Sequence, residues 1–352
     1  MCGERYPADA RFCPRDGTKL ERVVSPAPSS GSASAPASVS AIPHRRVDFG
    51  KLVGQRLDDR YQILRKIGEG GMSFVYLAED GQTGEQVAIK ILSPQLIQDQ
   101  NAMARLRREA ALGTRLAHPN LCHIVRVGET PSKLVYVVMP YVQGELLCDR
   151  AIRLGRIDLA TTVRWVADIA AGLHAAHELG IIHRDLKPEN VMICPLGDGS
   201  DRAVVMDFGL AKERRVGPDV QKLTATGIVL GTPEFMSPEQ LRGKSLDPRT
   251  DIYSLGLMTF ELLTGKLPFA GRTQQEIMIA RLKGEPIPLR QMCPELNFPA
   301  AVEKVLTKSL QRDPEHRYRT APEFATALAA AAETGSDGGE GPGSLLDRFL
   351  RR

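Results

Sequence analysis

The sequence predicts an α+β protein with two lobes, the first made mainly of antiparallel strands and the second mainly of helices. Three observations carry this prediction. The first third of the globular body is rich in Val, Ile and Tyr and is punctuated by glycine clusters, as strands are. The remainder repeats apolar residues at helical spacing. Two short apolar runs joined by a Gly/Asp segment indicate one hairpin within that helical part.

Five strands and one helix are expected in the first lobe. The strands are the stretches with the strongest β-type composition, at residues 61–67, 74–79, 86–92, 121–127 and 133–139. The helix lies between the third and fourth strands. Apolar or small residues recur there at steps of three or four, at Met103, Leu106, Ala110, Gly113 and Ala117.

The second lobe is expected to begin with a long helix and to contain a small hairpin. The helix runs from Leu159 to His177 with a period of about 3.6, and Gly180 is its predicted stop. The hairpin joins residues 191–194 to residues 203–206.

Composition divides the chain into four parts. The head, linker, globular body and tail are residues 1–22, 23–54, 55–333 and 334–352. The linker is Ser, Ala and Pro with hardly an aromatic residue, so it buries too little apolar area to fold. Within the body the two lobes are residues 61–140 and 141–333, and the tail is expected to be flexible.

Bulk properties exclude several classes of protein. The chain has 352 residues and 42% apolar residues, enough for a packed core, and a formal net charge of only +4. Such a small charge gives no case for nucleic acid. The six cysteines are scattered, which argues against a disulfide framework. No apolar run reaches the roughly 20 residues of a membrane-spanning helix. With a polar N-terminus that shows no signal peptide, the expected location is the cytoplasm.

A glycine-rich turn between the first two strands is the first candidate site. It contains Gly68, Gly70, Gly71 and Ser73, and Val75 follows. Glycines let the backbone approach phosphate oxygens and offer N–H groups to them. A plain hairpin turn explains the glycines equally well when the motif stands alone.

A lysine inside the third strand is the second candidate. Lys90 ends the run Val87-Ala88-Ile89 and is costly to bury without an anionic partner. A nucleotide phosphate and the carboxylate of Glu109, in the expected helix, would supply one. The alternative is a lysine that reaches solvent at a strand edge.

The strongest signal is an ordered set of polar residues after the long helix. The chain reads His183-Arg-Asp-Leu-Lys-Pro-Glu-Asn190, and Asp207-Phe-Gly follows. In phosphoryl transfer Asp185 would accept the proton of the attacking hydroxyl and Lys187 would neutralise charge on the transferred group. Asn190 and Asp207 offer the hard oxygens that Mg²⁺ prefers. Turn caps would explain each piece singly but not the ordered set.

Taken together these motifs resemble the eukaryotic-like (Hanks-type) serine/threonine protein kinase family in its bacterial form. The resemblance spans about Tyr61 to Leu328 and includes an Ala-Pro-Glu-like end at Ser237-Pro-Glu239. It implies a bilobal protein kinase fold with a five-stranded antiparallel N-lobe, one N-lobe helix and a mainly helical C-lobe. It also implies ATP and Mg²⁺ as cofactors, with Mn²⁺ as an alternative, and protein substrates with Ser or Thr acceptors.

Further roles follow from the resemblance alone. The adenine is expected against apolar residues of both lobes and the segment between them, at Ile67, Val75, Ala88, Met139, Pro140, Val142 and Met192. Asp251 resembles the aspartate that braces the catalytic loop, and Glu239 with Arg317 resembles a structural ion pair. Plain lobe core is the alternative for the apolar residues.

Acceptor choice and control also follow from the resemblance. Lys187 and Thr232 are typical of the serine/threonine branch, and Thr232 would contact Asp185. We expect activation by phosphorylation of Thr224 or Thr226 in trans, through a transient homodimer. An unmodified loop is the alternative.

Two competing functions remain open. One is a pseudokinase-type scaffold that binds nucleotide without transferring phosphate, although Lys90, Asp185 and Asp207 are all present. The other places the function in a zinc-binding head. Cys2, Cys13 and Asp16 resemble a degenerate zinc ribbon, but three ligands fall short of a closed site.

Overall fold

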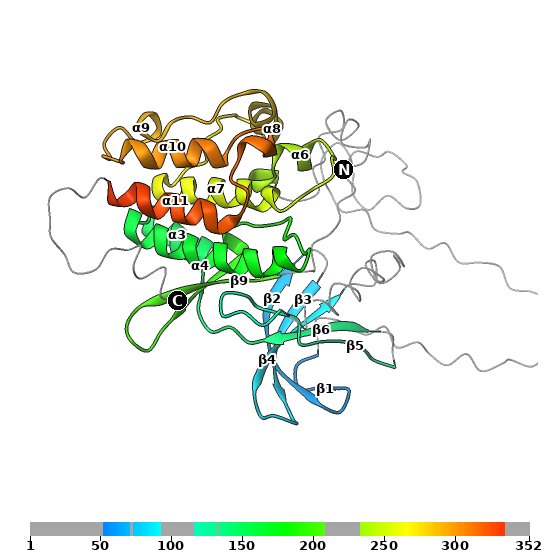
Figure 1. Cartoon of the computed structure of the whole chain (residues 1–352). Coiled ribbons are helices and arrows are strands. Elements are labelled where there is room, and N and C mark those ends of the chain that lie inside the picture. The colour runs from blue at the N-terminus through cyan, green and yellow to red at the C-terminus, as the bar shows by residue number, and fades with distance from the viewer. Residues whose placement is uncertain (1–51, 71–72, 93–115, 132–133, 208–232, 335–352) are drawn as a thin grey trace, which may run out of the picture. The chain divides into compact units, whose positions relative to one another are not determined.

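The computed structural model describes residues 52–70, 73–92, 116–131, 134–207 and 233–334 (Figure 1). All of these residues belong to one compact unit, residues 47–352. The predicted head, most of the linker, the N-lobe helix and nearly all of the tail lie outside the described residues. The boundaries proposed for those parts therefore stay predictions.

The N-lobe is a sheet in which every neighbouring pair of strands is antiparallel. Its strand order is β1-β2-β3-β4-β6-β5. The strands are β1 (Arg56–Leu57), β2 (Tyr61–Gly70), β3 (Ser73–Asp80), β4 (Gln86–Leu92), β5 (Arg126–Glu129) and β6 (Val135–Pro140). The α+β fold class is confirmed, and the sheet adds the two-residue β1 to the five expected strands.

The C-lobe is mainly helical in its described part and carries a second, three-stranded sheet. That sheet has the order β7-β8-β9, with strands β7 (Glu145–Leu146), β8 (Val191–Pro195) and β9 (Asp201–Val205). The α-helices are α3 (Leu147–Leu154), α4 (Leu159–Glu178), α6 (Pro238–Leu241), α7 (Arg249–Thr264), α8 (Gln274–Lys283), α9 (Leu289–Met292), α10 (Ala300–Ser309) and α11 (Ala321–Glu333). Single 3-10 turns are η1 (Pro188–Asn190), η2 (Pro233–Phe235) and η3 (Pro314–His316).

The long helix α4 begins and ends as its sequence predicts. Asp158 caps it by accepting a hydrogen bond from the Thr161 N–H, which is one of the unpaired donors of the first turn. Gly180 follows the last turn with a φ of 72°, a conformation that glycine adopts without strain.

One strand prediction was wrong. Residues 121–127 were expected to form a strand of the N-lobe sheet, but β5 begins only at Arg126. The start of the run, at Leu121, pairs with β9 of the other sheet instead. The Cys122 N–H donates to the Val205 carbonyl at 2.8 Å, and the Val205 N–H donates to the Asn120 carbonyl at 2.8 Å. The β-type character of residues 121–127 was recognised correctly, but the residues contribute to both sheets.

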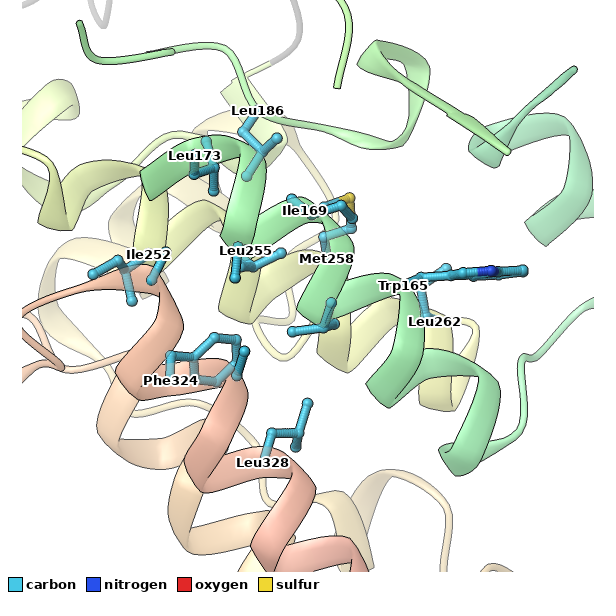
Figure 2. Packing of buried hydrophobic residues seen from close by; sticks show 14 of the residues in the cluster. Trp165, Ile169, Leu173, Leu186, Ile252, Leu255, Met258, Leu262, Phe324 and Leu328 are labelled. Carbon is cyan, nitrogen blue, oxygen red and sulfur yellow. The ribbon is translucent and has the colours of Figure 1, made fainter. Parts of the chain in front are cut away.

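The two lobes have separate cores. The C-lobe core gathers residues of α4, α7 and α11, and Leu186 lies at one end of the residues drawn, beside Leu173 (Figure 2). The only tryptophan of the chain, Trp165, is buried there and donates its indole N–H to Asp201 at 2.8 Å. The N-lobe core is smaller, and its largest fully buried side chains are Tyr61, Tyr76 and Tyr136. None of the described helices combines the length and the apolar character that a membrane span requires.

Candidate active site

The catalytic loop, residues 183–190, follows α4 in the chain and is held by a buried carboxylate of α7. Asp251 accepts a hydrogen bond from the His183 N–H at 2.8 Å and one from the Arg184 N–H at 2.9 Å. Its Oδ2 also lies 2.8 Å from Nε2 of His177. Burial opposes the ionisation of Asp251, but these contacts outweigh it and lower the pKa of the carboxyl. The predicted brace is confirmed.

Asp251 holds the loop in a conformation that is unfavourable for Arg184. Arg184 has a φ of 65°, which non-glycine residues rarely adopt. Such strain persists only where surrounding contacts fix it, and it concentrates at functional sites. The strained residue directly precedes Asp185.

Asp185, Lys187 and Asn190 converge. The Asn190 side-chain amide donates to the Asp185 carbonyl at 2.7 Å and to its Oδ2 at 3.3 Å. Nζ of Lys187 lies 3.4 Å from the same Oδ2. Asp185 therefore has its carboxylate oriented by two neighbours of its own loop while about half of it remains exposed to solvent.

Lys90 of β4 contacts Asp207, which lies two residues after the end of β9. Its Nζ lies 2.7 Å from Oδ2 of Asp207. The lysine side chain is 14% exposed and the aspartate 36%. Asp207, like Arg184, is a non-glycine residue with positive φ, at 59°. The adjacent Met206 is fixed on both sides, because its N–H donates to the Asn190 carbonyl at 2.8 Å and its carbonyl lies 2.9 Å from Nε2 of His183.

An apolar cluster joins the two lobes next to this ion pair. Its buried members include Ala88 of β4 and Met139 of β6. Partly buried residues pack against it, including Ile67, Val75, Val142 and Met192. Six of the seven residues expected around the adenine thus belong to one cluster. The seventh, Pro140, ends β6 and pairs with Val87.

The glycine-rich turn is described only in part. Gly68 is in register with Val75, and Gly70 with Ser73, across the antiparallel pair β2–β3. The strand-to-strand setting predicted for the motif is therefore present. Gly71 lies outside the described residues.

Several predicted residues cannot be located. Glu109, Thr232, Thr224, Thr226, Cys2, Cys13 and Asp16 lie outside the described residues. Among the described residues, no group of three or more His, Cys, Asp or Glu side chains could hold a metal ion. Where the structure can be followed, the partner of Lys90 is Asp207.

The segment from η2 to α6 is fixed from several sides. Glu239 accepts two hydrogen bonds from the Arg317 guanidinium, at 2.7 and 2.8 Å, which confirms the expected ion pair. Burial opposes the ionisation of Glu239, but Arg317 and Thr250 outweigh it and lower its pKa. Ser237 and Gln240 form a capping box at the start of α6.

Sequence reasoning missed two residues beside the site. Gln240 donates to the Arg184 carbonyl at 2.7 Å and thereby ties α6 to the catalytic loop. Cys122 is buried, and its Sγ lies 3.7 Å from the carbonyl of Pro140, the last residue of β6. Burial raises the pKa of its thiol to about 12. Cys122 belongs to no motif, whereas Gln240 is the last residue of a capping-box pattern, Ser237-Pro-Glu-Gln240, which was a signal in the sequence.

This fold and this site define a protein kinase. A family model for the protein kinase domain matches residues 61–327, which is most of the chain. The chain therefore belongs to the protein kinase domain family, whose members use ATP and a divalent metal ion and act on proteins. The predicted resemblance to bacterial Hanks-type kinases is also confirmed by the similar proteins described next.

Serine/threonine-protein kinase pkn3 of Myxococcus xanthus is 36% identical over 286 residues, 81% of this chain and 52% of that protein. Serine/threonine-protein kinase PrkC of Bacillus subtilis is 38% identical over 280 residues, 80% of this chain and 42% of that protein. The crystal structure of the PknI kinase domain of Mycobacterium tuberculosis matches with a TM-score of 0.62 at 26% identity, covering 80% of this chain and 99% of that one.

The chain spans only about half of the length of these two curated relatives. The similarity concerns their kinase domains.

Proposed function

We propose that this chain is an active serine/threonine protein kinase that transfers the γ-phosphate of ATP to Ser or Thr hydroxyls of proteins. One observation carries the proposal. Lys90 of the N-lobe sheet contacts Asp207 at 2.7 Å, and Asp207 follows a residue tied to Asn190 and His183 of the catalytic loop. The charged amine of Lys90 thereby lies near the two proposed metal ligands, Asn190 and Asp207. The proposed base, Asp185, belongs to the same loop as Asn190, so the site holds the groups that phosphoryl transfer requires.

The chemical step would use Asp185 and Lys187. The Asp185 carboxylate accepts the proton of the acceptor hydroxyl while the hydroxyl oxygen attacks the γ-phosphorus. The bond from that phosphorus to the β–γ bridging oxygen breaks, and ADP leaves. Lys187, 3.4 Å from the Asp185 carboxylate, offsets the negative charge on the transferred group.

Asn190 and Asp207 would hold the divalent cation. Both side chains offer hard oxygen atoms, which is the ligand chemistry that Mg²⁺ prefers, and Mn²⁺ would also fit it. When bound, the ion neutralises charge on the phosphate oxygens. Lys90 would bind phosphate from the N-lobe side, and Glu109 stays a predicted partner for it.

The apolar cluster would receive the adenine. Val75 and Ala88 would cover one face of the ring and Met192 the other, with Ile67 and Met139 at its margins. The Pro140 carbonyl and the Val142 N–H would bind the polar edge of the ring. The glycine-rich turn at Gly68, Gly70, Gly71 and Ser73 would lie over the phosphates.

Several finer predictions stay open. They are activation through Thr224 or Thr226, acceptor recognition by Thr232, a transient homodimer, a cytoplasmic location and zinc at Cys2, Cys13 and Asp16. Zinc content of the purified protein with and without residues 1–22 tests the last of these.

Asp185→Asn tests the proposed function. Transfer of labelled γ-phosphate to a generic basic protein such as histone should fall by about 10²- to 10⁴-fold, the range for loss of a general base. Asp198→Asn, in an exposed turn between β8 and β9, is the matched control and should keep full activity. Wild-type protein that binds ATP but transfers nothing would favour the scaffold instead.

A further inference from the structure

Three consecutive carbonyls, those of residues 234–236 at the end of η2, are each held by a buried side chain of another helix. Arg281 of α8 donates from Nη2 to the Glu234 carbonyl at 2.6 Å and from Nη1 to the Met236 carbonyl at 3.1 Å. Ser254 of α7 donates its hydroxyl to the Phe235 carbonyl between them at 2.8 Å. We call these contacts the carbonyl clamp. Through them, α7 and α8 hold the main chain of residues 234–236.

Arg281 is an unusual residue to find in this place. It is 0% exposed, and its guanidinium lies over the Phe269 ring at 5.7 Å. Burial lowers the pKa of Arg281 below its ordinary value, which reflects the cost of keeping a cation there. An apolar side chain could pack in such a site without that cost, so stability alone is a weak reason for a buried cation. A guanidinium, however, presents several donors in a fixed plane and can hold two carbonyls at once.

The clamped main chain is connected to the catalytic loop. Directly after it, the Ser237 N–H donates to Oε1 of Gln240 at 2.9 Å. The same Gln240 side chain donates from Nε2 to the Arg184 carbonyl at 2.7 Å. Only one peptide bond then separates this contact from Asp185. A shift of the clamped residues would therefore change their position relative to the proposed base.

We propose that Arg281 is a positioning residue for the protein acceptor, acting through the main chain of residues 234–236. This rests on the proposed function, because it takes Asp185 as the point that the acceptor hydroxyl must reach. The clamp fixes the backbone beside Asp185 against which an acceptor chain rests. Arg281 itself touches neither substrate nor nucleotide.

The test compares Arg281→Gln and Arg281→Lys with a matched control in the full chain. Lysine keeps the charge but cannot hold two carbonyls in the same planar way, so it should restore only part of the effect. Arg242→Gln is the control, because Arg242 also donates to a main-chain carbonyl, that of Leu282 at 3.1 Å, but at the exposed surface. Each variant is assayed for kcat and for KM towards histone and towards ATP.

For Arg281→Gln we expect kcat/KM for histone to fall by about 10- to 100-fold, as for other small misplacements of a reacting group. KM for ATP should change by less than about twofold, because the nucleotide contacts are untouched. Amide hydrogen exchange should accelerate in residues 233–240 and stay unchanged in β2–β4. Arg242→Gln should match the wild type in all three measurements.

Two results would overturn the inference. One is an Arg281→Gln protein with wild-type kinetics and exchange. The other is a parallel loss towards histone and ATP that follows only the fraction of folded protein, which would make Arg281 purely structural. Wild-type protein without any transfer to histone would instead contradict the proposed function, and the exchange measurement would still decide whether the clamp exists.

Discussion

The two lobes contribute to the site by different physical means. The N-lobe supplies apolar surface at Val75, Ala88 and Met139 and one described cation, Lys90, all carried on a hydrogen-bonded sheet. The C-lobe supplies the other polar groups and fixes them through the hydrogen bonds that Asp251 accepts and through the buried pair of Glu239 and Arg317. A regular sheet positions residues by register, whereas an irregular loop needs side chains to fix its backbone.

This difference predicts where each lobe is vulnerable. In the C-lobe, loss of one of these hydrogen-bonded groups should disturb folding and catalysis together, because the remaining partners are left without hydrogen bonds. In the N-lobe, loss of packing should affect stability while leaving the chemical step intact. Two substitutions test the contrast, and a third tests a C-lobe carboxyl whose charge opposes folding, in order of decreasing expected effect.

Asp251→Asn should be the most damaging. The amide removes the charge and turns a donor towards an N–H group that needs an acceptor, which should cost about 3–5 kcal/mol of folding free energy. A displaced catalytic loop should also lower kcat by about 100-fold. Urea unfolding and steady-state kinetics measure the two effects. Lys90→Met is the contrasting variant: it should abolish transfer with little change in the urea midpoint. Wild-type kcat in Asp251→Asn would refute the brace.

Leu52→Ala should destabilise the N-lobe without slowing the chemical step. Leu52 is 2% exposed and packs into the tyrosine-rich core, although it precedes the residues matched by the family model. Truncating a buried leucine costs about 2–5 kcal/mol. Val53→Ala is the matched control, because Val53 is 52% exposed and should change stability by less than about 0.5 kcal/mol. Equal unfolding midpoints for both variants would show that residues 52–57 add nothing to the core.

Glu261→Gln should stabilise the protein, and only at higher pH. Burial, together with the charges of Glu189 and Glu234, raises the pKa of Glu261 from 4.5 to about 7. The folded state therefore binds more protons than the unfolded state between pH 4.5 and 7, and stability falls as the pH rises through that window. At pH 8 the variant should gain about 1–2 kcal/mol, after allowance for partial solvent exposure.

Towards pH 4.5 the gain from Glu261→Gln should disappear, because the wild-type carboxyl is then neutral in the folded state. Urea unfolding at several pH values measures this. Glu178→Gln, at an exposed position of α4, should show no such trend. A gain that does not vary with pH would point to a cause other than ionisation.

Much of the fold could be predicted because local pattern and final structure agree. Strand β4 was predicted with both its ends, since its nearly continuous run of apolar residues is bounded by polar ones on both sides. Residues 121–125 were mispredicted because composition reports β-type character but not the partner. The partner of Leu121 and Cys122, β9, lies about eighty residues further along the chain.

The residues of the candidate site also fall into those that the sequence indicated and those that it did not. Asp185, Asn190 and Asp207 belong to motifs whose spacing reflects shared chemistry, so the sequence brings them to notice. Arg281 and Gln240 act through main-chain carbonyls, which any sequence possesses, and no pattern indicates which carbonyls need a donor. A weak signal existed for Arg281, because an arginine in the apolar run Ile277-Met-Ile-Ala-Arg-Leu282 is expected to find partners.

The single tryptophan gives the two lobes different optical signals. Trp165 belongs to the C-lobe core, whereas the aromatic side chains of the N-lobe core are mainly tyrosines. Fluorescence excited at wavelengths that only indole absorbs would therefore follow melting of the C-lobe alone. Tyrosine absorbance would follow both lobes in the same sample, because Tyr253 and Tyr318 are buried in the C-lobe core. Titrating nucleotide while recording both would show whether the ligand makes the lobes unfold as one cooperative body, with no label attached to the protein.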